Sequence, residues 1–519
     1  MIATKIEAPF RSRFQRIGRA CMVLLLLVNG TLIALAQSAE APDGELPENA
    51  DTAQQVEEVA DVSETVPPRA SDAEPERAPV SAAESEPSTP DFDQMTARDY
   101  FALLEFGESY WEMLLDGQPL AVEEQEAIVR VLTRIRRLQP HRTTQWLRLE
   151  TPWKELAEQP AAHRLEIFLL TGEITAIRTR KIPPEAAERA GLEVYYEVDV
   201  RVHRQEGPAP GTIVVEQIPA VWKKTLDEGG SVEGEPFSCP GIYLKAFPAE
   251  EGQSGYVFAT PKISWHPSQP NAALGLTEAH VQLAEQGMDV AELSQVEDRV
   301  RFSGKEREPF YQMMAAVRRI PPSQQKPTIE ASVSQLLTQQ ENGLMVTPEK
   351  YRAQFLRLQG LCRRITRIEV EDEDIRGRLG ISHYFEVSIF VPIESPIVSQ
   401  RQGDEATRKE FSNDYPVLVC VPELPPGLKA GEDLHQEVAA TGAFFKLWAY
   451  RTPFMSREDF TRRQISPLLI ASTVEVAAPL GAPQLNEFAL ALGVVLVGVI
   501  GVGVAFGVLF ARRSHKRRR

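Results

Sequence analysis

Residues 194–202 read VYYEVDVRV and residues 383–391 read HYFEVSIFV, and the fold class follows from these two segments. In both, apolar side chains recur at every second position, which is the pattern of a strand with one buried face. A glycine, Gly191 or Gly380, stands shortly before each stretch. The shared order of aromatic pair, glutamate and valine indicates two copies of one structural unit.

Four more pairs of segments match in the same order along the chain. They are a helical segment with a basic pair (128–138 and 310–320), a strand-like segment (170–177 and 358–365), an apolar residue before proline (218–219 and 421–422) and a glycine-to-lysine segment (241–245 and 442–446). The offset between partners stays between 182 and 203 residues, as loop insertions would produce. An ordered set of matches indicates a tandem duplication. We place the two repeats at residues 92–270 and 271–473.

The strand set of each repeat resembles an OB-fold. The resemblance lies in a first strand with an internal glycine (Gly172, Gly360), the aromatic-Glu-Val strand, and a late strand that follows 431–433 and ends at 442–448. It covers about 100 residues in each copy. It implies an α+β fold class, with helices followed by a small OB-like β-barrel in each repeat. OB-folds often bind oligonucleotides or oligosaccharides on one barrel face, but a fold alone does not assign a function.

The N-terminus has the layout of a secretory signal. A stretch with four arginines, from Arg11 to Arg19, precedes a mostly apolar run from Cys21 to Ala36, which closes with the small residues of a signal-peptidase site. Charge, a short apolar segment and a small-residue cleavage site together predict a signal peptide over residues 1–36. An uncleaved signal anchor is the alternative, and it would leave the same part of the chain outside the cytoplasm.

The C-terminus predicts a membrane anchor. Phe488 to Phe510 is an uninterrupted apolar run of 23 residues; as a helix it measures about 35 Å, enough for a hydrocarbon core of ~30 Å. The basic tail, residues 511–519, stays on the cytoplasmic side and argues against a GPI signal, whose apolar tail ends the chain. We therefore predict a single-pass protein of the plasma (inner) membrane with its bulk outside the cytoplasm. Gly503 and Gly507 form a GxxxG pair that would let two such helices approach in a homodimer.

Composition suggests two linkers and an acidic exterior. Residues 37–91 lack aromatic side chains and are rich in proline and acids, so we expect disorder there, and a shorter linker spans 474–487. The net charge is −17; residues 1–36 carry +4 and the tail +6, which leaves −27 on the part between them. So acidic a surface repels nucleic acid, and we expect no nucleic-acid partner. The absence of Asn-x-Ser/Thr acceptors between residues 37 and 487 favours a bacterial envelope.

Cysteines and motifs give no sign of a reactive centre. Only Cys239, Cys362 and Cys420 follow the signal, too few for a disulfide framework. The last two could pair, but buried thiols are the preferred interpretation. We find no catalytic signature, no cofactor motif and no histidine or cysteine spacing typical of a metal site, so we predict no cofactor and leave enzymatic activity uncertain but less favoured.

Two recurring pairs of charged residues are candidates for a ligand-binding face. Lys245 and Lys446 recur on the late strand and would contact an anionic ligand, unless they are solvated strand residues. Glu197 and Glu386 recur beside aromatic residues, which suits sugar binding or acid–base chemistry; a cross-strand ion pair is the alternative. The acidic run 371–374 would suit calcium, but it lacks the spacing of the known calcium loop, so a solvated loop is preferred.

These features favour a membrane-anchored, extracytoplasmic binding or scaffolding protein of the cell envelope, with another envelope protein as its partner. The alternative is a carbohydrate-binding or carbohydrate-active envelope protein that uses the glutamates flanked by aromatic residues.

Overall fold

The computed structural model describes residues 95–104, 111–138, 140–249, 252–401, 404–456 and 461–478. All of them belong to the second of two units, residues 1–87 and 88–519. The predicted signal peptide, acidic linker, membrane helix with Gly503 and Gly507, and basic tail lie outside the described residues. Within the described ranges, no helix has the length and apolar character that crossing a bilayer requires.

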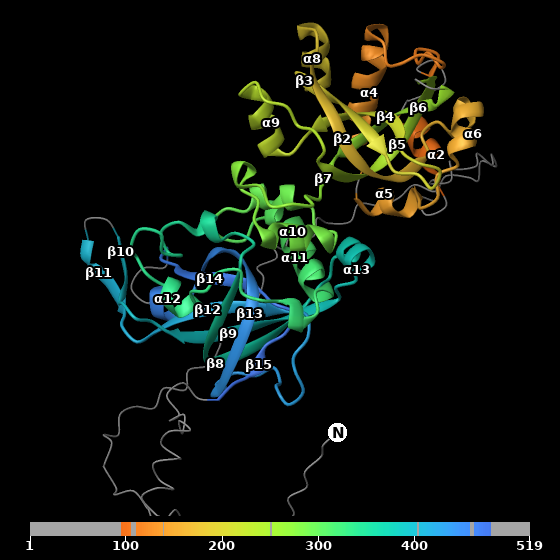
Figure 1. Cartoon of the computed structure of the whole chain (residues 1–519). Coiled ribbons are helices and arrows are strands. Elements are labelled where there is room, and N and C mark those ends of the chain that lie inside the picture. The colour runs from red at the N-terminus through yellow and green to blue at the C-terminus, as the bar shows by residue number, and fades with distance from the viewer. Residues whose placement is uncertain are drawn as a thin grey trace, which may run out of the picture. The chain divides into compact units, whose positions relative to one another are not determined.

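The first half combines short helices with one sheet (Figure 1). Its helical elements are α2 (Ala97–Leu103), η1 (Val122–Glu124), α4 (Gln125–Ile135), α5 (Pro140–Trp146), α6 (Trp153–Glu158), α7 (Pro160–His163), α8 (Pro184–Ala190) and α9 (Ala220–Asp227). Its strands are β1 (Leu147–Arg148), β2 (Ile167–Lys181), β3 (Val194–Val202), β4 (Ala209–Gln217), β5 (Pro236–Pro248), β6 (Ser254–Lys262) and β7 (Ser264–Trp265).

The second half repeats this plan with more 3-10 turns. Its helical elements are η3 (Ala272–Leu274), α10 (Glu278–Glu285), η4 (Val290–Gln295), η5 (Gly304–Glu306), α11 (Arg307–Arg319), η6 (Pro322–Gln324), α12 (Val333–Leu336), η7 (Pro348–Tyr351), α13 (Glu373–Leu379) and α14 (Pro453–Ser456). Its strands are β8 (Phe355–Glu369), β9 (His383–Pro392), β10 (Ile397–Arg401), β11 (Asp404–Phe411), β12 (Asp414–Val421), β13 (Gln436–Tyr450), β14 (Gln464–Ile470) and β15 (Glu475–Val476).

Both main sheets close on themselves in the same way. The first is a seven-stranded sheet in the order β1-β2-β3-β4-β6-β5-β7, and a further pairing joins β2 to β5. The second is a six-stranded sheet in the order β14-β12-β9-β8-β13-β15, and a further pairing joins β14 to β13. Within each closed ring of five strands one pair is parallel, β4 with β6 and β12 with β14, and the short β1 adds a second parallel pair to the first sheet by lying beside β2. The predicted mixed α+β class with two sheets is therefore confirmed.

Local details recur at corresponding places in the two halves. β2 and β8 are both 15 residues long, and each has a register shift shortly after its internal glycine. Gly172 and Gly360 admit no side chain, because a Cβ at either would collide with a carbonyl oxygen of the neighbouring strand. Gly191 and Gly380 end α8 and α13 in the left-handed region, with φ of 60° and 66°, where glycine is favoured. The segments matched in the sequence thus occupy matching positions in the structure.

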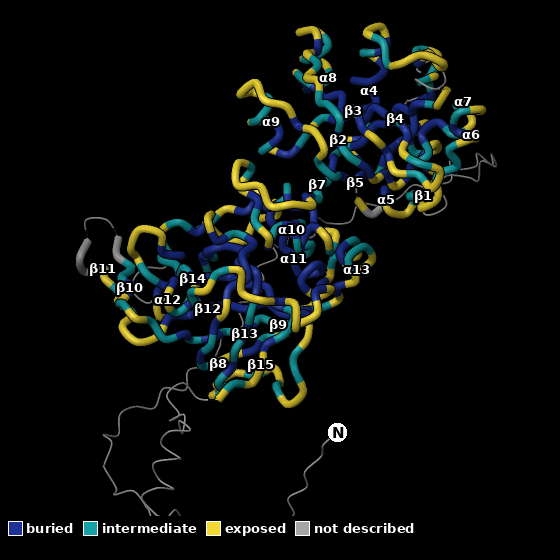
Figure 2. Tube along the Cα trace, viewed as in Figure 1, coloured by how far each residue is buried: buried dark blue, intermediate teal, exposed yellow. Residues whose placement is uncertain are grey.

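One helix packs against each main sheet, α4 in the first half and α11 in the second. α4 packs Ile128, Leu132 and Ile135 against the first sheet, within a cluster that includes Val214 and Val257. α11 packs Phe310 and its neighbours in a cluster that includes residues of β9, β12 and β13. The apolar residues of the aromatic-Glu-Val strands are buried as predicted: Val198, Val200, Val202, Val387, Ile389 and Val391. Figure 2 shows the strands largely buried and the tips of α8 and α9 exposed.

The cysteines described are free and buried: Cys239, Cys362 and Cys420. The preferred sequence interpretation, buried thiols rather than a Cys362–Cys420 bridge, is confirmed.

Candidate ligand-binding site

Lys245 and Lys446 lie inside the protein, each in an ion pair with a glutamate. Lys245 Nζ lies 2.6 and 2.7 Å from the two carboxylate oxygens of Glu124, and neither side chain is exposed. Lys446 pairs in the same way with Glu306, and again neither side chain is exposed. Burial lowers the pKa of Lys446, and the hydrogen bond and charge of Glu306 oppose that fall. Neither ammonium group faces a ligand, so both act on the fold.

The two glutamates also close the turns that precede the covering helices. The Glu124 carboxylate accepts hydrogen bonds from the backbone N–H groups of Leu115 and Ala121, at 2.8 and 2.7 Å. The Glu306 carboxylate accepts from Glu297 and Ser303, at 3.0 and 2.8 Å. Each ion pair therefore ties the late strand, β5 or β13, to the start of α4 or α11.

Glu197 is held in cross-strand ion pairs. It lies on β3 with only 6% of its side chain exposed, and it pairs with Arg180 at 2.8 Å and Arg178 at 3.3 Å, both on β2. Arg178 also pairs with Asp199. The sequence left a cross-strand ion pair as the alternative, and Glu197 forms one. Its carboxylate is therefore not available to a ligand.

Glu386 stands at the corresponding place on β9 but lacks those partners. In the first sheet the residues opposite Glu197 and Tyr195 are Arg178 and Arg180. In the second sheet the residues opposite Glu386 and Tyr384 are Thr366 and Ile368. No arginine or lysine of the described residues forms an ion pair with Glu386. The two repeats therefore share the glutamate and differ in what neutralises it.

Glu386 is half-buried at a pocket of about 570 Å³. Burial raises the pKa of its carboxyl above the ordinary value, while the charge of Arg364 and a hydrogen bond from Tyr384 oppose that rise. Burial likewise raises the pKa of the Tyr384 hydroxyl. A half-buried carboxyl of raised pKa in a pocket of ligand size marks a candidate functional site.

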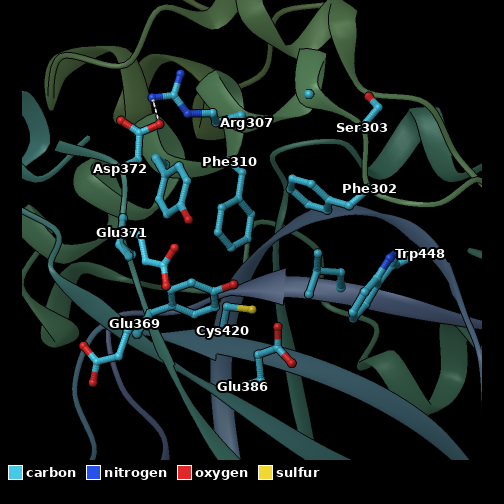
Figure 3. Close-up of a pocket in the computed structure, with 15 residues that line it drawn as sticks. Phe302, Ser303, Arg307, Phe310, Glu369, Glu371, Asp372, Glu386, Cys420 and Trp448 are labelled. Atoms are coloured by element: carbon cyan, nitrogen blue, oxygen red, sulfur yellow. Dashed lines mark ion pairs between the residues drawn. The ribbon is translucent and has the colours of Figure 1, made fainter. Parts of the chain in front are cut away.

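Aromatic rings make up much of the pocket wall. They come from the loop before η5, from α11, from β9 and from β13: Phe302, Phe310, Tyr311, Tyr384 and Trp448. Phe310 is the centre of this set, with its ring centroid 5.2 Å from that of Phe302 and 5.5 Å from that of Tyr384, both edge to face. Figure 3 shows Phe302 and Trp448 at one end of the pocket and Arg307 with Asp372 at the other.

The acidic run 371–374 forms part of the pocket rim and the start of α13. Asp372 caps α13 by accepting hydrogen bonds from the backbone N–H groups of Asp374 and Ile375, at 3.0 and 3.2 Å, and it also pairs with Arg307. Asp374 pairs with Arg378 at 3.0 Å. Both carboxylates thus have structural partners. No cluster of potential metal ligands occurs among the described residues.

The sequence analysis included Glu386 and missed the residues around it. Phe302 precedes and Arg307 begins α11, which the sequence shows only as an apolar stripe. Trp448 lies near the end of β13, whose apolar run suggests core. A usable signal was present in the repeat alignment itself. Arg178 and Arg180 align with Thr366 and Ile368, so the alignment alone reveals a glutamate that loses two basic neighbours.

Comparisons with known proteins identify no relative. No protein-family model and no curated protein matches the chain. Among solved structures, wild-type single-stranded DNA binding protein from Thermus aquaticus is 9% identical, covers 60% of this chain and 93% of its own, and has a TM-score of 0.13. Fission yeast Pot1 with ssDNA is 10% identical, with coverage of 62% and 86% and a TM-score of 0.15. Scores this low carry no argument about function.

The sequence-based prediction of no nucleic-acid partner does not stand, because the charge argument on which it rested is not valid. The solved structures named above are of DNA-binding proteins, and so is the Ifi202 HINa domain in complex with 20bp dsDNA, 7% identical with a TM-score of 0.11. The prediction inferred the charge of every part of the surface from the net charge of the whole chain. A net charge of −17 describes the whole chain and does not exclude a basic patch on one face.

Proposed function

We propose that this protein is a membrane-anchored, extracytoplasmic carbohydrate-binding protein of the cell envelope, and that the pocket of the second repeat is its binding site. The observation that carries the proposal is Glu386, a carboxyl without an ion-pair partner among the described residues, at the edge of an aromatic pocket. Sugars offer hydroxyl groups to a carboxylate and apolar ring faces to aromatic side chains. The pocket supplies both kinds of contact.

We further propose that each closed sheet is an OB-like barrel. The support is the ring of five paired strands in each half, with its one parallel pair, together with the glycine in the first strand. In the first repeat the glutamate is neutralised and the barrel serves the fold. In the second repeat the same position faces a ligand.

The membrane anchor is a proposal that rests on the sequence of residues 488–510 and the basic tail after them. Alkaline extraction of cell membranes tests it. An integral protein stays in the pellet, and release into the supernatant would refute the anchor without touching the binding proposal.

The binding site is tested on the full chain, purified in mild detergent, with a glycan array followed by titration of any hit. Glu386→Gln should weaken binding about tenfold or more, the usual cost of a charge-assisted hydrogen bond. Glu197→Gln is the matched control and should leave binding unchanged while it lowers stability. Absence of binding to every glycan, or equal losses in both variants, would refute the proposal.

A further inference from the structure

A second hollow, of about 440 Å³, adjoins the pocket and has the opposite charge. It is lined by Arg301, Arg451 and Arg463, together with aromatic residues. Phe302 and Trp448 line both spaces. One aromatic wall therefore separates an acidic pocket from a basic hollow.

The three arginines come from three different segments. Arg301 precedes η5, Arg451 follows the end of β13, and Arg463 stands immediately before β14. None of the three forms a salt bridge with a carboxylate of the described residues. Elsewhere in the second half, arginines such as Arg352 and Arg378 lie within 2.6–3.0 Å of carboxylates.

Three guanidinium groups that line one hollow, with no carboxylate among its lining residues, repel one another. Partial removal from water, followed by the positive charges of Arg301 and Arg451, lowers the pKa of Arg463. Like charges gathered in this way cost folding free energy, and a bound anion removes that cost. Guanidinium groups present several donors in a plane and suit carboxylate and phosphate oxygens.

The rings beside the arginines can hold a planar or apolar ring face. Trp448 and Tyr450 are stacked, with ring centroids 4.9 Å apart and an interplanar angle of 29°. Both alternate with buried residues along β13, so their rings stand on the same face of the strand. The hollow thus pairs anion donors with an aromatic platform.

The sequence of the first repeat has no basic residue at the three corresponding positions. Alignment of Lys446 with Lys245 pairs Arg451 with Glu250 in sequence. The strand pairs that these lysines belong to, β13 with β14 and β5 with β6, then align Arg463 with Gly252. The turn glutamates Glu124 and Glu306 align Arg301 with Pro119. None of the three first-repeat residues is basic, so the basic hollow and the open carboxylate occur together in the second repeat.

From this juxtaposition we infer that the pocket and the hollow form one site for an acidic glycan. The neutral part of a sugar lies in the pocket against the aromatic rings, and its carboxylate or phosphate substituent meets Arg301, Arg451 and Arg463. A cationic ligand is opposed by the three arginines, and an anion within the pocket is opposed by Glu386 and the acidic rim. This inference rests on the proposed carbohydrate function and specifies its ligand class.

The test compares ligands that differ only in charge. The full chain is titrated with a galacturonic acid tetrasaccharide, with its fully methyl-esterified form, and with a hexose phosphate, which distinguishes carboxylate from phosphate as the preferred anion. Arg451→Gln combined with Arg463→Gln should weaken binding of the acid tenfold or more, about one lost charge-assisted contact. Binding of the ester should not change. Arg148→Gln combined with Arg201→Gln, at two exposed arginines of the first repeat, is the matched control for the loss of two charges.

The outcomes separate the two proposals. Preference for an anionic sugar that disappears in the double variant supports the inference. Equal binding of acid and ester, unaffected by the variant, refutes it and leaves the carbohydrate function intact. Failure of every sugar to bind refutes both, and arginine-dependent binding of a single-stranded oligonucleotide instead would assign the hollow to nucleic acid.

Discussion

Replacement of Lys446 by methionine tests the weight of the buried ion pair on the fold. The methionine fills a similar volume but leaves the Glu306 carboxylate buried, with no exposed area and no cation. The two backbone hydrogen bonds to Glu306, at 3.0 and 2.8 Å, remain and offset part of the loss. Removal of one partner from a buried pair costs about 3–5 kcal/mol.

That cost predicts a large shift in thermal stability. For a domain of about 150–250 residues, each kcal/mol moves the melting temperature by roughly 2–4 °C, so we expect a fall of roughly 6–20 °C. Differential scanning calorimetry and urea unfolding of the full chain measure it. Lys245→Met in the first repeat should cost a similar amount, because its pair with Glu124 has the same burial.

An exposed pair provides the control. Lys154 is 83% exposed and lies 3.8 Å from Glu158, and such surface pairs contribute about 0–1 kcal/mol. Lys154→Met should therefore be nearly neutral. If Lys446→Met also falls within about 1 kcal/mol of the unchanged protein, the buried ion pair does not stabilise the fold in the way its burial predicts.

Three further predictions follow from the titratable groups. Burial raises the pKa of Glu386 above 4.5, so the folded state loses stability as pH rises through the folded-state pKa and the carboxyl ionises. Glu386→Gln should therefore have a higher melting temperature than the unchanged protein at neutral pH. If the same gain persists at pH 3, ionisation of Glu386 is not its cause. Burial lowers the pKa of His280 from 6.5 to about 4, so the unfolded chain binds a proton at a higher pH than the folded chain does. The free energy of unfolding should therefore fall as pH drops from 6.5 towards 4, and it should fall less in His280→Gln. Urea titrations across that pH range measure both. Burial raises the thiol pKa of Cys239 to about 12 and of Cys362 to about 11, and that of Cys420 well above 9.0. These thiols should react with a chromogenic disulfide only after unfolding. Rapid labelling of any of them in the folded chain would contradict their burial.

Much of the fold could be predicted because it depends on local periodicity. The alternation in residues 194–202 and 383–391 defines strands whose buried valines and isoleucine lie where expected. The glycines at 172 and 360 follow from close approach of a neighbouring backbone. The helices that carry the basic pairs, α4 and α11, also follow from the apolar stripe.

The surroundings of the charged candidates could not be predicted, since their partners are distant in sequence. Lys245 and Glu124 are 121 residues apart, and Lys446 and Glu306 are 140 apart. A register shift at each lysine also breaks the alternation that would place it on an outer face. Without the tertiary contacts, a buried lysine and a solvated one have the same local sequence.

The difference between Arg178 and Arg180 in the first repeat and Thr366 and Ile368 in the second gives this one chain two settings of the same glutamate. One repeat holds the carboxylate in ion pairs, and in the other it has no ion-pair partner among the described residues. The first repeat is therefore an internal control for the second, under identical solvent and expression conditions. Placing arginine at residues 366 and 368 would give Glu386 the neighbours that Glu197 has and would show what the unpaired carboxylate contributes.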